Sequence, residues 1–210
     1  MTTGLLTASY ITASVLFILA LGGLSNQEKA KRAVWYGIVG MIIAVIATIF
    51  GNSVFVTEWL NWLIIAIVVG SIIGAIVAKK VQMTGMPQLV AALHSFVGLA
   101  AVFIGINSAL LPHSEMSNSQ LMIHNVEVFI GVFIGAITFT GSIVAFGKLS
   151  EIITGKALIL PGRHTLNIIM LLACFTLGYM FLTHSANWTL IVMTIIAFII
   201  GAHLVLAIGG

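Results

Sequence analysis

The stretch from Trp59 to Lys80 reads WLNWLIIAIVVGSIIGAIVAKK, and it decides the fold class. It opens with about 20 mostly apolar residues, which is the length that a helix needs to cross the hydrocarbon core of a bilayer. Lys79 and Lys80 follow directly, and lysines at the end of such a run mark the boundary of the membrane. The stretch therefore predicts a transmembrane helix that ends in a cationic connection.

The same pattern recurs along the whole chain. Of its 210 residues, 60% are hydrophobic and 6% are charged, whereas about a quarter of a soluble domain is charged. This composition excludes a soluble domain, a disordered tail and a nucleic-acid-binding protein, and predicts an all-α, polytopic transmembrane helix bundle. We expect one transmembrane domain over residues 1–210, without a soluble domain. Seven spans are predicted, at about 4–24, 33–51, 59–78, 88–110, 123–147, 165–182 and 188–208.

The positive charges predict the orientation of these spans. All eight lysines and arginines fall in every second connection, namely 25–32, 79–87 and 148–164. The other three connections contain none. Because cytoplasmic connections are enriched in lysine and arginine, we expect the N-terminus outside and the end after the seventh span in the cytoplasm.

The connections are too short to carry a nucleotide-binding domain. A βαβ unit alone needs roughly 30 residues, and the longest connection is 148–164. The sequence contains no G-x-G-x-x-G, H-E-x-x-H or C-x-x-C motif. We therefore predict no catalytic, cofactor-binding or metal-binding residue in this chain.

His94 is an ionisable residue inside the fourth predicted span. Such residues are costly in a membrane and face a bundle interior or a water-filled cavity. At helical spacing, His94 shares a broad face of small residues with Gly98 and Gly105. Histidine titrates near neutral pH, so His94 could carry protons. It could equally be a structural histidine bonded to another helix, and the residues alone leave both interpretations open.

Glu127 lies near the outer end of the fifth predicted span. Gly131, Thr138 and Ser142 follow it on one polar and small stripe of the helix. Glu127 is either a carboxylate of a proton path or an interfacial residue that reaches water, and both interpretations stay open. His203, among apolar residues of the seventh span, is expected to be a structural histidine with its hydrogen bonds satisfied.

Four stretches of the sequence are distinctive. They are MPQLVAALHSFVGLAA (86–101), EVFIGVFIGA (127–136), FTGSIVAFGKL (139–149) and LPGRH (160–164). They strongly resemble the membrane part of the β subunit of proton-translocating NAD(P) transhydrogenase. The resemblance covers essentially the whole chain, and such long non-repetitive matches are more specific than a short motif.

The resemblance implies a function that the composition alone does not. The family couples hydride transfer from NADH to NADP⁺ with inward proton movement, and His94 matches the family's intramembrane histidine. We predict a proton pathway that comprises His94, Ser95, Glu127 and Ser142. NAD(H) and NADP(H) are expected to bind outside this chain in the complete enzyme, so the isolated chain should be inactive in hydride transfer.

The resemblance also implies partners and a location. We expect the transhydrogenase α subunit and the NAD(H)- and NADP(H)-binding domains as partners, in a homodimeric assembly of the bacterial inner membrane, without nucleic acid. The family's subunit continues with two more spans and an NADP(H) domain, so we expect this chain to be a fragment or a truncated gene product. Gly85 and Gln88 stand where some relatives carry acidic residues.

Two other functions remain to be weighed. An autonomous transporter or ion channel could use the same polar face around His94 and Glu127 without any nucleotide. A purely structural anchor would assemble with partner subunits and would not depend on either residue.

Overall fold

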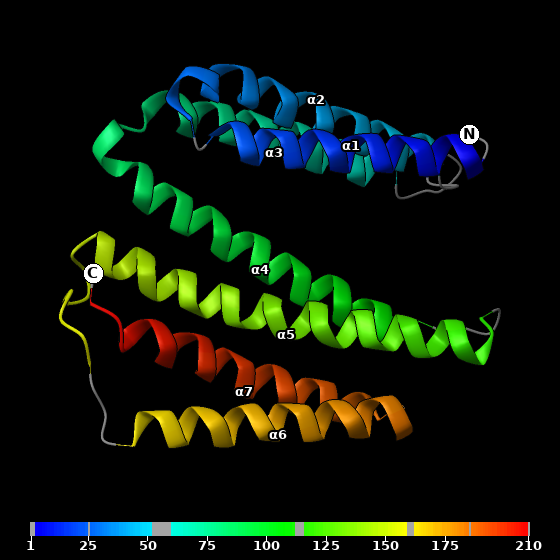
Figure 1. The fold of residues 1–210 in the computed structure, drawn as a ribbon, viewed down its shortest axis with the longest axis vertical. Helices are drawn as coiled ribbons and strands as arrows, with labels where there is room; N and C mark the ends of the chain where they lie inside the picture. Colours follow the sequence, from blue (N-terminus) through cyan, green and yellow to red (C-terminus); the bar gives the residue numbers. More distant parts are fainter. Residues whose placement is uncertain are drawn as a thin grey trace. The chain divides into compact units, whose positions relative to one another are not determined.

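The computed structural model of the chain describes residues 3–24, 26–51, 60–111, 116–158, 162–184 and 186–209. Every regular element in these ranges is helical, and seven of the helices are long and apolar enough to cross a membrane (Figure 1). This confirms the predicted all-α class with seven spans. The chain divides into two compact units, Met1–Lys80 and Val81–Gly210, and the expected single domain stays a prediction.

The helices begin and end close to the predicted spans, with two extensions into polar sequence. Their bounds are α1 Thr3–Leu24, α2 Gln27–Gly51, α3 Leu60–Lys80, the short 3-10 helix η2 Met83–Gly85, α4 Met86–Leu110, α5 Asn118–Leu149, α6 Arg163–His184 and α7 Asn187–Leu206. α5 starts before its apolar run because Ser117 and Gln120 form a capping box, in which the Ser117 N–H donates to Gln120 Oε1 over 3.0 Å. α2 starts early enough that the cations of the first connection lie on the helix itself.

In the first unit, α1 and α2 form a hairpin that packs through small residues. The buried side chains of this hairpin are alanines, none more than 6% exposed: Ala13, Ala20, Ala33 and Ala47. The Tyr10 hydroxyl and Thr48 Oγ1 form a hydrogen bond of 3.0 Å between the helices. Small side chains let two helices approach closely, which is how membrane helices associate where lipid is as apolar as the side chains.

In the second unit, α5 lies between α4 and α7, and α6 packs against α7 (Figure 1). Their shared core holds larger side chains than the α1–α2 hairpin does. The buried members of this core are Val102, Val128, Phe129, Val132, Ala136, Cys174, Phe181, Leu190, Met193, Ala197 and Ile200. The long and central α5 therefore contacts all three other helices of the unit.

Apolar side chains also cover the outside of both units. Exposed examples are Ile18, Leu21, Trp62, Phe96, Ile104 and Leu172. Contiguous apolar surface of this kind is unfavourable in water but suits hydrocarbon, where helices satisfy every backbone polar group internally. Together with the seven spans, this surface identifies an integral membrane protein.

Candidate functional site

α4 and α5 come together at two glycines. A Cβ placed on Gly98 would lie 2.7 Å from the Gly135 carbonyl oxygen, and one placed on Gly135 would lie 2.8 Å from the Gly98 carbonyl oxygen. Any side chain at either position would therefore collide with main-chain atoms of the other helix. The buried residues of α4, which are Ser95, Gly98, Val102 and Gly105, line this contact, and we call it the α4–α5 seam.

Ser95 is the polar member of the α4–α5 seam. It is 7% exposed and lies one helical turn before Gly98. Its Oγ donates a hydrogen bond of 2.7 Å to the Ala92 carbonyl oxygen. The hydroxyl proton is donated within the same helix, so Ser95 Oγ can act only as an acceptor towards a protonated neighbour.

His94 lies on the flank of the seam. The seam centres on Gly98 and Gly105, whose missing side chains allow the closest approach, and this leaves the His94 side chain exposed. Its Nδ1 lies 2.8 Å from the Val90 carbonyl oxygen. A carbonyl oxygen can only accept, so Nδ1 must carry the proton of this hydrogen bond. The neutral ring then has its lone pair on Nε2, which is the atom that can take up a further proton.

Ser142 lies on the side of α5 that faces α4. It is two helical turns after Gly135, so both residues point in nearly the same direction. The two helices run antiparallel, because Gly98 meets Gly135 while Gly105 meets Val132. Gly135 contacts Gly98, Ala101 and Val102 of α4, and seven residues before these lie Ala91, His94 and Ser95. His94, Ser95 and Ser142 therefore lie at about the same height along the two helices.

Glu127 lies at a different level. It is exposed and precedes Ser142 on α5 by about 22 Å, at about 1.5 Å per residue. The helices are joined near Glu127 by a polar contact, in which Ser108 Oγ and His124 Nε2 are 3.1 Å apart. Of the four residues predicted for the proton pathway, three are thus placed at one level and Glu127 is placed towards the other end of α5.

The sequence did not indicate that His203 pairs with Asn167. His203 Nδ1 lies 2.7 Å from Asn167 Oδ1, which links α7 to α6. The other ring nitrogen, Nε2, is buried and has no hydrogen-bond partner among the described residues. The expected structural histidine is therefore satisfied at one nitrogen only. A signal for the pair was present in Asn167 itself, a polar side chain about one turn into an apolar run.

Lys148 is a second residue whose role the sequence did not reveal. It was counted among the cations of a connection, but it lies in the last turn of α5 and is 8% exposed. Its Nζ donates to the carbonyl oxygens of Leu206, over 3.1 Å, and of Ile208. Leu206 is the last residue of α7 and Ile208 follows it closely, and the helix dipole favours a positive charge at this end. Lys148 therefore ties the end of α5 to the end of α7.

Gln88 makes the corresponding connection from α4. Its Nε2 donates a hydrogen bond of 2.8 Å to the carbonyl oxygen of Leu149, the last residue of α5. An amide donates to a carbonyl oxygen, whereas an ionised carboxylate only accepts, so this link needs the Gln88 amide.

Comparison with known proteins shows which family this chain resembles. Residues 6–210 match the sequence profile of the NAD(P) transhydrogenase beta subunit. The NAD(P) transhydrogenase subunit beta of Rhodospirillum rubrum is 43% identical over 213 aligned positions, and the same subunit from a named strain of that species matches equally. The alignment covers 100% of this chain and 45% of each relative. The chain therefore spans less than half the length of these relatives.

Proposed function

Because this chain belongs to the NAD(P) transhydrogenase beta subunit family, we propose that it forms the proton-translocating membrane part of a complete transhydrogenase. Hydride transfer from NADH to NADP⁺ then takes place in soluble domains that bind NAD(H) and NADP(H) outside this chain. The alpha subunit and these domains are its partners, in a dimeric complex of the bacterial inner membrane. The separation of positive charges supports an outside N-terminus.

The observation that carries this proposal is the arrangement around His94. Nδ1 is held by the Val90 carbonyl oxygen, and this leaves Nε2 as the proton-accepting atom at the level of Ser95 and Ser142. When Nε2 is protonated, it becomes a donor, and the two hydroxyl oxygens are acceptors at the same level. The charge on the ring thus changes the hydrogen bonds that His94 can make beside the α4–α5 seam.

This change at the seam is the step that couples protons to the nucleotide domains. In this mechanism the α4–α5 seam has two states that bind the proton on His94 with different affinity. Protonation of His94 therefore shifts the equilibrium between the two states, and occupancy of the attached NADP(H) domain shifts the same equilibrium in return. Glu127 stands towards the opposite end of α5. With the N-terminus outside, protons that move inward meet Glu127 first and His94 and Ser142 afterwards.

The complete enzyme in sealed vesicles tests this proposal. We expect His94→Ala to abolish proton pumping driven by hydride transfer, measured with a pH-sensitive dye, while binding of NAD(H) and NADP(H) to the soluble domains is retained. His184→Ala is the matched control, because His184 is an exposed histidine in the last turn of α6. Wild-type pumping by the His94 variant would refute the assignment.

The isolated chain separates this function from that of an autonomous transporter or channel. Purified chain in liposomes is expected to move no protons and no other ions unaided, and to catalyse no hydride transfer. A steady ion flux that His94→Ala abolishes would favour the transporter. A complete enzyme that stays fully active when both His94 and Glu127 are replaced by Gln would instead favour a structural anchor.

A further inference from the structure

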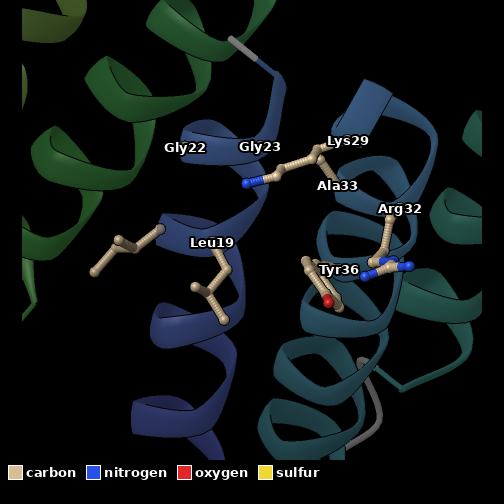
Figure 2. A pocket seen from close by; sticks show the side chains of 8 residues that line it. Leu19, Gly22, Gly23, Lys29, Arg32, Ala33 and Tyr36 are labelled. Carbon is tan, nitrogen blue, oxygen red and sulfur yellow. The ribbon is translucent and has the colours of Figure 1, made fainter. Parts of the chain in front are cut away.

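A cavity of about 500 Å³ opens beside the α1–α2 hairpin, near the connection of the two helices (Figure 2). It is lined by Ile18, Leu19, Gly22 and Gly23 of α1 and by Lys29, Arg32, Ala33 and Tyr36 of α2. The helices touch on one side of it, where a Cβ on Gly23 would lie 2.7 Å from Ala33 Cβ. A Cβ on Gly22 would meet no atom within 4 Å. A side chain in place of Gly22 would therefore have room to enter the cavity.

The α2 side of this cavity is cationic. Lys29, Arg32 and Tyr36 follow one another at helical spacing and share one face of α2. Figure 2 shows the Lys29 side chain extending from α2 toward the end of α1, with Arg32 and Tyr36 further along α2. Glu28 precedes Lys29 but is not among the lining residues. The cavity thus offers two positive charges and a hydroxyl donor, which together suit an anionic oxygen ligand such as a phosphate group.

The α1 side of the cavity is apolar and exposed. Ile18 is 68% exposed and Leu19 is 50% exposed, and both lie in the membrane-spanning part of α1. A free phosphate ion would gain nothing from these side chains. A phospholipid would place its phosphate between the cations and its acyl chains along α1, because basic pockets between membrane helices suit anionic headgroups.

We propose that this cavity binds an anionic phospholipid, with Lys29 and Arg32 at the phosphodiester and the Tyr36 hydroxyl as a further donor. The ligand is a lipid rather than soluble phosphate because charge and apolar surface meet in one cavity. The site lies within the first unit and shares no residue with the α4–α5 seam. The binding assay below therefore does not depend on proton translocation.

Native mass spectrometry of the detergent-purified full chain tests this proposal. The probes are phosphatidylglycerol, phosphatidylcholine and soluble glycerophosphoglycerol. We expect one phosphatidylglycerol molecule to bind at least tenfold more tightly than phosphatidylcholine, and glycerophosphoglycerol to bind more weakly than the intact lipid. Equal binding of the two lipids would overturn the role of charge. Equal binding of phosphatidylglycerol and glycerophosphoglycerol would overturn the lipid in favour of a soluble phosphodiester.

Charge variants place the ligand in the cavity. Lys29→Gln and Arg32→Gln should each weaken phosphatidylglycerol binding about fivefold, the effect of removing one cation near a headgroup. Lys31→Gln removes the same charge from the same helix, but Lys31 does not line the cavity, so binding should be unchanged. An equal loss in all three variants would show attraction by the general charge of this segment and would overturn the site.

A steric variant tests the cavity with both cations in place. The Gly22 Cβ direction is open, so Gly22→Leu should fold and fill the space, and circular dichroism checks that it does. We expect this variant to lose specific phosphatidylglycerol binding. Undiminished binding in folded Gly22→Leu would overturn the proposal, and the charge variants test it independently if the leucine variant does not fold.

Discussion

The α1–α2 hairpin and the four-helix unit of α4 to α7 solve the same packing problem differently. In the hairpin, the buried side chains are alanines. In the four-helix unit, the core holds Phe181, Leu190 and Met193, together with buried polar residues. The helices there are also joined by side-chain hydrogen bonds, such as the 2.7 Å bond from Thr140 Oγ1 to the Phe198 carbonyl oxygen.

The hairpin and the four-helix unit are therefore suited to different roles. Close packing of small residues holds two helices together but offers no group that can change its charge. Polar contacts between helices have alternative partners, so a proton that arrives can favour one arrangement over another. The proposed proton pathway lies in the unit whose core contains buried polar residues, and the proposed lipid site lies in the hairpin. The following substitutions test how far this division of roles holds.

The largest effect is expected at the α4–α5 seam. Gly98→Ala would place a methyl group 2.6 Å from the Phe139 nitrogen, so the helices must move apart, at a cost of about 3 kcal/mol. Gly131→Ala, on α5, meets no atom within 4 Å and should be neutral or slightly stabilising. Equilibrium unfolding in mixed micelles measures both. Equal stabilities of the two variants would contradict the backbone contact described here.

Lys148→Met should have the next largest effect. It removes the hydrogen bonds from a buried charged group to the end of α7, which we expect to lower the free energy of unfolding by about 2 kcal/mol. Lys156→Met is the control, because Lys156 is exposed and its loss should change little. Hydrogen exchange of the last turn of α7 should increase in the Lys148 variant only. Unchanged protection there would show that Lys148 does not hold the helix end.

The smallest effect is expected in the hairpin. Tyr10→Phe removes the hydrogen bond to Thr48 but leaves Thr48 Oγ1 donating to the Ala44 carbonyl oxygen over 2.8 Å. We expect a loss of about 0.6 kcal/mol, the average for such bonds between membrane helices, measured by the same unfolding assay. A loss as large as that of Lys148→Met would mean that the hairpin also depends on polar contacts.

The sequence predicted the spans well because a bilayer imposes one simple requirement on each of them. Runs of apolar residues and the positions of lysine and arginine are local features, and the seven helices follow them closely. The start of α5 was missed by five residues, because the Ser117–Gln120 capping box extends the helix beyond its apolar run.

The candidate site was harder to predict, because it depends on which faces meet. The small-residue face of α4 was recognised, but the position of His94 on its flank follows from the contacts of Gly98 with α5. Asn167 and His203 are 36 residues apart, and no local pattern connects them. Lys148 looked like any other cation of a connection, since its burial comes from the end of α7, which is distant in the sequence.

If His94 carries protons as proposed, its hydrogen bond to Val90 determines how a proton can pass this residue. In a Grotthuss-type wire, an imidazole takes a proton at one nitrogen and releases another at the opposite nitrogen. His94 cannot do this while Nδ1 donates to the Val90 carbonyl oxygen, because Nε2 is then the single site of exchange. A proton must arrive at and leave from the same atom, so the ring or its helix has to turn in between. Such a turn can depend on a conformational change elsewhere in the protein, whereas a continuous wire would let protons pass at all times.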